Sequence, residues 1–193
     1  MKRSRAVFLA LSALAALALL LNTPSSTRGT APEASAALRL AAPLVPLAAN
    51  VQWVRVDAAM REGRPDKVLA RADALLALDA HSGDAQSFLS SYFGLQLASP
   101  EREPDAARRV AWLRVALDYA AHGERHAERP WEFALWQGEL LARAALVDPA
   151  TAWPGGVRAL WSEAAAHFER GAAGHPIGHA RAAECRAALE TLR

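Results

Sequence analysis

Two pairs of histidines have a spacing that is able to hold a zinc ion. His122 and His126 are four residues apart, and so are His175 and His179, which would place two imidazoles on one face of a helix. The metalloprotease form of this motif has a glutamate directly after its first histidine, and neither pair has one. A glycine interrupts the first pair, and a proline and a glycine interrupt the second. We therefore expect no continuous helix through either pair, and we predict that these histidines lie in solvated turns and bind no metal.

Acidic residues gather in the stretch that holds Glu101, Glu103 and Asp105, together with Arg102. Paired carboxylates can do acid–base chemistry when burial shifts their pKa values. An exposed carboxylate keeps an ordinary pKa and makes a poor general acid. We interpret this stretch as a charged turn at the start of a helix, with a knob that contacts a partner as the alternative.

Ser87, Ser90 and Ser91 lie together on one predicted helix. No Gly-x-Ser-x-Gly elbow surrounds them and no strand precedes them, so they lack the setting of a catalytic serine. The glycines of the chain stand singly or at turns, so no phosphate-binding loop is indicated either. The sequence predicts a protein that is not an enzyme and that uses no cofactor and no small-molecule substrate.

Cys185 is the single cysteine, so no intramolecular disulfide can form. It falls in line with Ala182, Leu189 and Leu192 on one face of a predicted helix. We interpret it as a small buried apolar residue, with a reactive or intermolecular thiol as the alternative.

The 193-residue chain has room for one domain of ordinary size behind a leader. It is rich in alanine and has a single isoleucine, so strong helix formers outnumber strand formers. We therefore predict an all-α fold. The net charge is +2; Lys2, Arg3 and Arg5 contribute +3 of it, so the rest of the chain carries −1. No one-sided basic surface is indicated, which argues against a nucleic-acid partner.

Residues 1–22 have the pattern of a signal peptide or a signal anchor, because a basic start precedes an apolar run over 6–21. As a helix this run would span about 24 Å, against about 30 Å for the core of a bilayer. The best small-x-small cleavage site, Ala34-Ser35-Ala36, lies well beyond the run. Two alternatives stay open, an inner-membrane anchor and a cleaved leader with secretion. In both, the residues beyond about 37 face the periplasm or the exterior, and only the N-terminal segment contacts a membrane.

Residues 23–38 are mostly Pro, Ser, Thr, Gly and Ala, which predicts a flexible tether before a helical domain over 39–193. The first helix of that domain has apolar residues at helical spacing in two adjacent stripes. The stripes are Leu47, Val51, Val54 and Ala58, and Trp53, Val56 and Met60. Gly63 is expected to end this helix and Pro65 to open the second, which together form an antiparallel pair.

Five more helices are predicted over 84–98 and 105–121 and from about 130, 157 and 177. Ser82 is a plausible N-cap of the first of them, and Ser99 or Glu103 of the second. The pairs begin near 47, 83 and 130, intervals of about 36 and 47 residues that suit a helical-pair repeat. The last helix is single, and its side with Arg181, Glu184 and Arg186 is expected to face solvent and cap the stack.

Residues 47–82 resemble a tetratricopeptide repeat. The shared features are Trp53 in the first helix, the Gly63 turn with Asp66 after it, and the closing segment 76–79, Leu-Ala-Leu-Asp. The departures are Val56 and Leu75, where the family prefers small residues, and Ala80 in place of a helix-ending proline. The resemblance implies a right-handed stack of antiparallel helix pairs, a TPR-like α-α superhelix with about three pairs and a C-terminal capping helix.

In such a stack the first helix of each pair would line a groove that holds a peptide or a protein. The polar groups that this resemblance places in the groove are Asn50, Asp57, Gln86, Ser90, Gln137 and Arg143. Among the tryptophans, we expect Trp53, Trp112, Trp136 and Trp161 in the core. Trp131 and Trp153 stand beside prolines, so we expect them to be exposed, Trp131 as a further partner contact. We therefore hypothesise a non-catalytic interaction scaffold, with a permanent structural subunit of an envelope assembly as the alternative.

Overall fold

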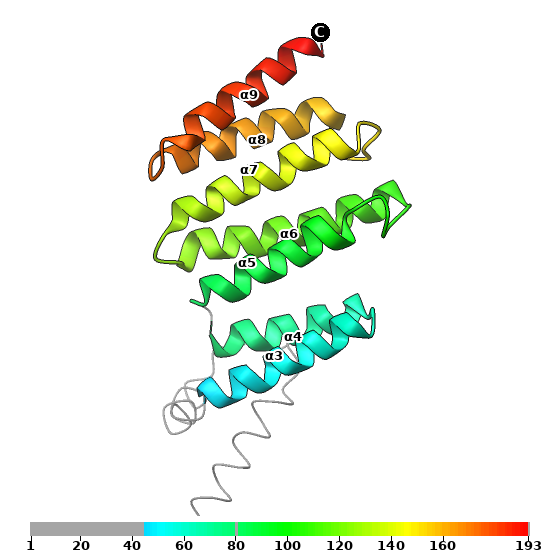
Figure 1. Cartoon of the computed structure of the whole chain (residues 1–193), viewed down its shortest axis with the longest axis vertical. Helices are drawn as coiled ribbons and strands as arrows, with labels where there is room; N and C mark the ends of the chain where they lie inside the picture. The colour runs from blue at the N-terminus through cyan, green and yellow to red at the C-terminus, as the bar shows by residue number, and fades with distance from the viewer. Residues whose placement is uncertain (1–44, 80, 193) are drawn as a thin grey trace, which may run out of the picture. The chain divides into compact units, whose positions relative to one another are not determined.

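The computed structural model describes residues 45–79 and 81–192, and its regular structure there is entirely helical, with seven α-helices and one short π-helix (Figure 1). The all-α prediction is confirmed for these residues. The segments 1–22 and 23–38, predicted as a signal or anchor and a tether, lie outside the described residues. No helix within 45–79 or 81–192 is long and apolar enough to cross a membrane. The chain divides into two compact units, one ending at Ala80 and one beginning at His81, and each is described by itself.

The first unit contains one hairpin, α3 (Val45–Arg61) and α4 (Pro65–Leu78). Gly63 forms the turn with a φ of +65°, a conformation that favours glycine. The main-chain N–H of Gly63 donates to the carbonyl of Met60 at 3.0 Å, which closes the last turn of α3. Pro65 then stands at the start of α4, where its missing N–H costs nothing. The turn that the sequence predicts is confirmed.

The buried side of α3 differs from the prediction. Ala48, Val56 and Ala59 are buried, whereas Leu47 is 53% exposed and Val54 is 69% exposed. The predicted stripe through Leu47 and Val54 is therefore wrong, because the side of α3 that is covered is rotated away from these two residues.

The second unit has its helices in the predicted order. They are α5 (Gly83–Ser91), η2 (Tyr92–Leu97), α6 (Ala106–His126), α7 (Pro130–Val147), α8 (Gly156–Ala172) and α9 (Ile177–Thr191). From α5 to α9, each helix packs against the next one along the chain, in a layered arrangement (Figure 1). Ser82 caps α5 as predicted, because its hydroxyl accepts from the N–H of Ala85 at 3.3 Å.

The N-cap of α6 is Asp105 and not Ser99 or Glu103. Its carboxylate accepts from the N–H groups of Ala107 at 2.8 Å and Arg108 at 3.2 Å. Glu103 supports the cap from outside, since its carboxylate accepts from the N–H of Asp105 at 3.1 Å. The cap moves one residue past Pro104 because a proline disfavours helical backbone in the residue before it.

The predicted helix over 84–98 is not α-helical throughout, because η2 is a π-helix. Phe93 in η2 is fully buried, whereas Phe88 in the preceding α5 is 44% exposed. At Gly94 an added Cβ would lie 2.7 Å from Leu140 on α7 and 3.0 Å from Ala116 on α6. Glycine is therefore required where these three helices come closest.

Helix α6 continues through Gly123 to His126, so the expected break at Gly123 is wrong. An added Cβ at Gly123 would lie 2.3 Å from the ring of Phe133 on α7. The glycine serves close helix packing and does not act as a helix breaker. The second histidine pair behaves as expected, because α9 begins at Ile177, after His175.

The final helix α9 is held to its neighbours by charged side chains. Arg181 donates to both carboxylate oxygens of Glu139 on α7, at 2.8 and 2.7 Å, and Arg186 donates to Glu169 on α8 at 2.6 Å. Glu184 and Arg186 are exposed as expected, whereas the side chain of Arg181 is only 33% exposed because it pairs with Glu139. Cys185, 2% exposed, is buried as the sequence predicts, and burial raises the pKa of its thiol.

Candidate partner-binding site

The structure spreads the predicted groove residues over surface and interior. Asn50 and Asp57 are exposed on α3, and Asp57 forms an ion pair with Arg61 one turn later. Arg143 is exposed on α7. The remaining three polar residues, Gln86, Ser90 and Gln137, are buried.

The buried polar residues join helices to one another. The Ser90 hydroxyl donates to the carbonyl of Ala116 on α6 at 2.8 Å and accepts from the indole N–H of Trp136 on α7 at 3.0 Å. Gln137 donates to the carboxylate of Glu124 on α6 at 2.6 Å. A partner on the surface of the unit does not reach Gln86, Ser90 or Gln137, and the polar groups of Ser90 and Gln137 are used in the packing of the helices.

The two tryptophans expected at the surface are both covered to some degree. Trp131 is half-buried and stacks on the imidazole of His175, with 5.6 Å between ring centres. Trp153 is only 9% exposed, and its indole N–H donates to Glu163 at 3.0 Å. The expectation of an exposed Trp153 is wrong, because the turn before α8 folds the ring inward. The four tryptophans expected in the core, Trp53, Trp112, Trp136 and Trp161, are all half-buried.

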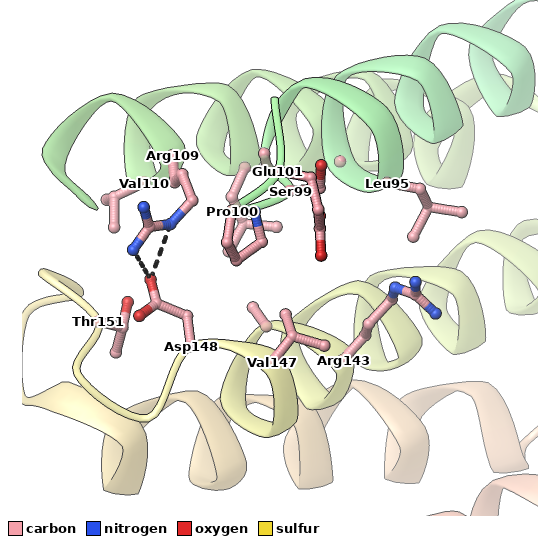
Figure 2. Close-up of a pocket in the computed structure, with 14 residues that line it drawn as sticks. Leu95, Ser99, Pro100, Glu101, Arg109, Val110, Arg143, Val147, Asp148 and Thr151 are labelled. Carbon is pink, nitrogen blue, oxygen red and sulfur yellow. Dashed lines mark hydrogen bonds and ion pairs between the residues drawn. The ribbon is translucent and has the colours of Figure 1, made fainter. Parts of the chain in front are cut away.

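Arg143 stands beside a cleft of about 60 Å³ in the second unit (Figure 2). Three segments form it: the end of η2 with the turn after it, the first half of α6, and the last turns of α7 with the residues that follow. Its apolar wall consists of Leu95, Pro100, Val110, Leu113 and Val147. The cleft is thus a small, mainly aliphatic hollow between the second and third helix pairs.

One end of the cleft is closed by an ion pair between Arg109 of α6 and Asp148 at the end of α7 (Figure 2). The guanidinium donates twice to one carboxylate oxygen, at 3.0 and 2.7 Å. It also donates to the carbonyls of Glu103 at 3.0 Å and Pro104 at 2.8 Å. The side chains of Arg109 and Asp148 are only 11% and 12% exposed. Arg109 therefore fixes the turn before α6 to the end of α7 and uses four of its five N–H donors within the chain.

The turn that carries Glu101 is closed by its own backbone. The N–H groups of Arg102 and Glu103 both donate to the carbonyl of Ser99, at 3.1 and 2.9 Å. Pro100 follows Ser99 and has the backbone angle that such a turn requires. These contacts hold Glu101 at the mouth of the cleft.

Glu101 and Arg143 approach the mouth of the cleft from opposite walls (Figure 2). Both are exposed, and the guanidinium of Arg143 has no hydrogen bond or ion pair to any residue in 45–79 or 81–192. A hydrogen bond from the Glu101 main chain, one from the Ser99 hydroxyl and the charge of Arg143 hold the pKa of the Glu101 carboxyl below its ordinary value. The mouth therefore presents a fixed anion and a cation with unused donors.

A second polar cluster joins α6, α7 and α8. Arg170 donates to Glu124 at 3.2 Å and to Nδ1 of His167 at 2.7 Å, and Gln137 completes the cluster through Glu124. Burial, followed by the charge of Arg170, lowers the pKa of His167 to about 4. The imidazole is therefore neutral at pH 7. Burial would raise the pKa of Glu124, but hydrogen bonds from Arg170 and Gln137 hold it below 4.5.

The histidines near the end of α6 contact one another. The rings of His122 and His126 are 4.4 Å apart, and Nδ1 of His81 donates to the carbonyl of His126 at 3.2 Å. Within the two described ranges, no three His, Cys, Asp or Glu side chains have an arrangement that could hold a metal ion. His81, which precedes α5, and His126 are exposed and His122 is half-buried, so these imidazoles lie at the surface near the end of α6.

The cleft residues differ in how visible they are in the sequence. Arg143 is among the predicted groove residues, and Glu101 lies in the turn for which a partner-binding knob is the alternative interpretation. Leu95, Val147 and Asp148 are missed. The signal for them is that the predicted helix over 84–98 ends shortly after Leu95 and that Asp148 begins the turn after the helix from about 130, so the ends of these two helices could have been compared. No protein-family model, curated protein or solved structure matches this chain.

Proposed function

We propose that the protein is a non-catalytic scaffold that holds a peptide or protein partner at the cleft beside Arg143. The observation that carries this proposal is an open aliphatic cleft of about 60 Å³ with an exposed, unused guanidinium at its mouth. Small-molecule sites generally enclose some 300–1,000 Å³, so a cleft of this size suits a single side chain of a larger partner. Aliphatic walls with a few polar groups at the rim are typical of a protein-recognition pocket.

We further propose that the helix pairs form a TPR-like right-handed superhelix. In support, the pairs α3–α4, α5–α6 and α7–α8 follow one another, and α9 remains as a single last helix. Buried glutamines recur in the first helices: Gln86 follows Gln52 by 34 positions, and Gln137 occupies the first helix of the third pair. A spacing of 34 residues is the period of tetratricopeptide repeats. Leu95 and Arg143 belong to the first helices of the second and third pairs, the helices that would line the groove.

The proposed location is the outer side of the inner membrane. The basic start and apolar run of residues 1–22 support an anchor that leaves the helical domain in the periplasm or exterior, or a leader whose cleavage leads to secretion. The proposed contact with a membrane is through this segment alone.

A permanent structural subunit is the second candidate, and exposed aliphatic residues favour it. Leu146 is 70% exposed and Val147 is 47% exposed, next to each other at the end of α7. Adjacent apolar side chains on a surface commonly mark a protein interface. A permanent partner would cover both side chains, whereas a transient one needs only the cleft.

Site-specific photo-crosslinking in the native host tests the proposal. A benzophenone amino acid replaces Val147 at the cleft, and a matched control carries it at Glu190, which is exposed on α9. We expect a discrete adduct with another protein from position 147 and none from position 190. Partial crosslinking that decreases on dilution indicates a transient scaffold, and a constant, near-complete adduct indicates a subunit. If position 147 gives no adduct with any protein, the cleft is not a partner site.

A further inference from the structure

We propose that the cleft recognises the main chain of its partner, with an aliphatic side chain in the hollow and a neutral peptide group between Arg143 and Glu101. This inference deepens the proposed function and depends on it. The occupant is an uncharged segment of a protein partner that contains Leu or Val.

The size of the hollow selects the side chain. A cleft of about 60 Å³ offers room for a handful of waters, at roughly 10–15 Å³ for each. Val and Leu side chains have three and four carbon atoms, a size that suits such a space. Leu95 and Val147 lie on the two sides of the hollow, so an aliphatic group there displaces water from apolar walls.

The charges around the hollow select a neutral occupant. Arg109 and Asp148 cancel each other and their hydrogen bonds are used within the chain. What remains is Arg143, which can only donate, and Glu101, which can only accept. For an ion at the mouth, attraction to one of these groups is offset by repulsion from the other, whereas a neutral group with a donor and an acceptor can satisfy both. The two groups lie on opposite walls of the cleft (Figure 2).

A peptide group matches this pair of partners. Each residue of a main chain carries one carbonyl acceptor and one N–H donor, without net charge. The carbonyl can accept from Arg143 while an N–H of the same segment donates to Glu101. Arg143 and Glu101 form no ion pair with each other, although the charge of Arg143 lowers the pKa of Glu101. The gap between the two charged groups is therefore open to a bound group.

The walls of the cleft are fixed before a partner arrives. Arg109 joins the turn before α6 to the end of α7 through four hydrogen bonds. The π-helix η2 places Leu95 on the opposite wall, and such helices often occur at functional sites. A preformed site loses little conformational entropy on binding, which suits recognition by few contacts.

The test measures binding of small probes to the full chain in lipid nanodiscs, by NMR of labelled Leu and Val methyl groups. The neutral probe is N-acetyl-leucine N-methylamide, which carries the side chain and two peptide groups. N-acetyl-leucine supplies an anion, leucine N-methylamide a cation, and N-acetyl-glycine N-methylamide lacks the side chain. We expect the neutral leucine probe to shift the methyl signals of Leu95 and Val147. The other three probes should bind about fivefold more weakly, the charged ones because attraction to one rim group is offset by repulsion from the other while the ion loses hydration.

Matched variants distinguish the roles of Arg143 and Glu101 at the mouth of the cleft from the effect of removing any surface charge. Arg143→Met and Glu101→Met each remove one charged hydrogen-bonding group, and each should weaken the neutral probe about three- to tenfold. Arg125→Met removes an exposed guanidinium on the last turn of α6 and should leave binding unchanged. Tighter binding of the anion than of the neutral probe, together with a gain in Glu101→Met, would overturn the inference in favour of an anion site.

Failure of this inference can be told from failure of the proposed function. If position 147 crosslinks to a protein but the neutral leucine probe leaves the Leu95 and Val147 signals unshifted, the scaffold stands and main-chain recognition is wrong. If neither the crosslink nor the shift is observed, both proposals are wrong.

Discussion

Arg109 and Asp148 stand 39 residues apart in the sequence and are joined by two hydrogen bonds to a single carboxylate oxygen. Because both side chains are nearly buried, the pair lies in an environment where losing one member leaves the other charge without compensation. The pair connects the turn before α6 to the end of α7, so it sets the distance between two walls of the cleft.

We predict that Asp148→Asn destabilises the second unit by about 3 kcal/mol, because the Arg109 guanidinium then stays buried without its counter-charge. Urea unfolding followed by circular dichroism measures the change. Glu132→Gln is the matched control, since Glu132 pairs with Arg129 at the surface, where such a pair contributes less than about 1 kcal/mol. Equal losses in the two variants would show that the Arg109–Asp148 pair has no special role.

The features of the fold that are predicted correctly from the sequence depend on residues close together in the chain. The turn at Gly63 and the cap at Ser82 depend on residues next to them in the chain, and both are found where expected. The order of the helices follows from apolar spacing and from prolines and glycines between them. The right-handed superhelix and the groove, which depend on how pairs stack, stay predictions.

Contacts between distant segments explain what the sequence does not predict. The π-helix η2 is not encoded in local apolar spacing, and Gly94 within it packs against Leu140 on another helix. The sequence shows that Ser90 and Gln137 are polar, but their hydrogen-bond partners lie on another helix. At the cleft, Arg143 is predicted from its position on a first helix, whereas its apolar wall comes from three separate segments.

A second prediction concerns the contact between α9 and α8. We expect Gly178→Ala to destabilise the unit by about 2–3 kcal/mol, because an added Cβ would lie 2.4 Å from the carbonyl oxygen of Phe168 and 2.6 Å from the N atom of Ala172. Main-chain atoms inside a helix cannot move aside as a side chain does. Hydrogen exchange should show faster opening of α9 in this variant.

The control for this variant is Gly83→Ala. At Gly83 the nearest atom to an added Cβ is in the ring of Phe133, at 3.8 Å, so the methyl group fits. We expect this variant to be neutral or more stable by up to about 1 kcal/mol, since alanine restricts the unfolded chain. A stable Gly178→Ala protein with unchanged exchange in α9 would contradict the packing described above.

A third prediction concerns Ser90 and Trp136, whose side chains share a hydrogen bond of 3.0 Å. Ser90→Ala and Trp136→Phe should each destabilise the unit, and Ser90→Ala should cost about 1–2 kcal/mol because the carbonyl of Ala116 also loses its donor. A double-mutant cycle should give a coupling energy of about 0.5–1.5 kcal/mol. Strict additivity of the two losses would mean that the contact contributes nothing to stability.

The last prediction is a pH dependence that comes from His167. Its pKa is about 4 in the folded chain and 6.5 ordinarily, so between these values the unfolded chain binds a proton that the folded chain does not. The contribution of His167 to the free energy of unfolding is therefore fully present above pH 6.5 and is lost as the pH falls from 6.5 towards 4. Glu124, whose pKa is below 4.5, adds a loss only at still lower pH. Urea unfolding midpoints at pH 7.5, 6 and 5 should decrease in the native chain, and His167→Gln, which has no proton to gain, should flatten that decrease. An identical slope in the two proteins would show that the imidazole is not held neutral by burial and by Arg170.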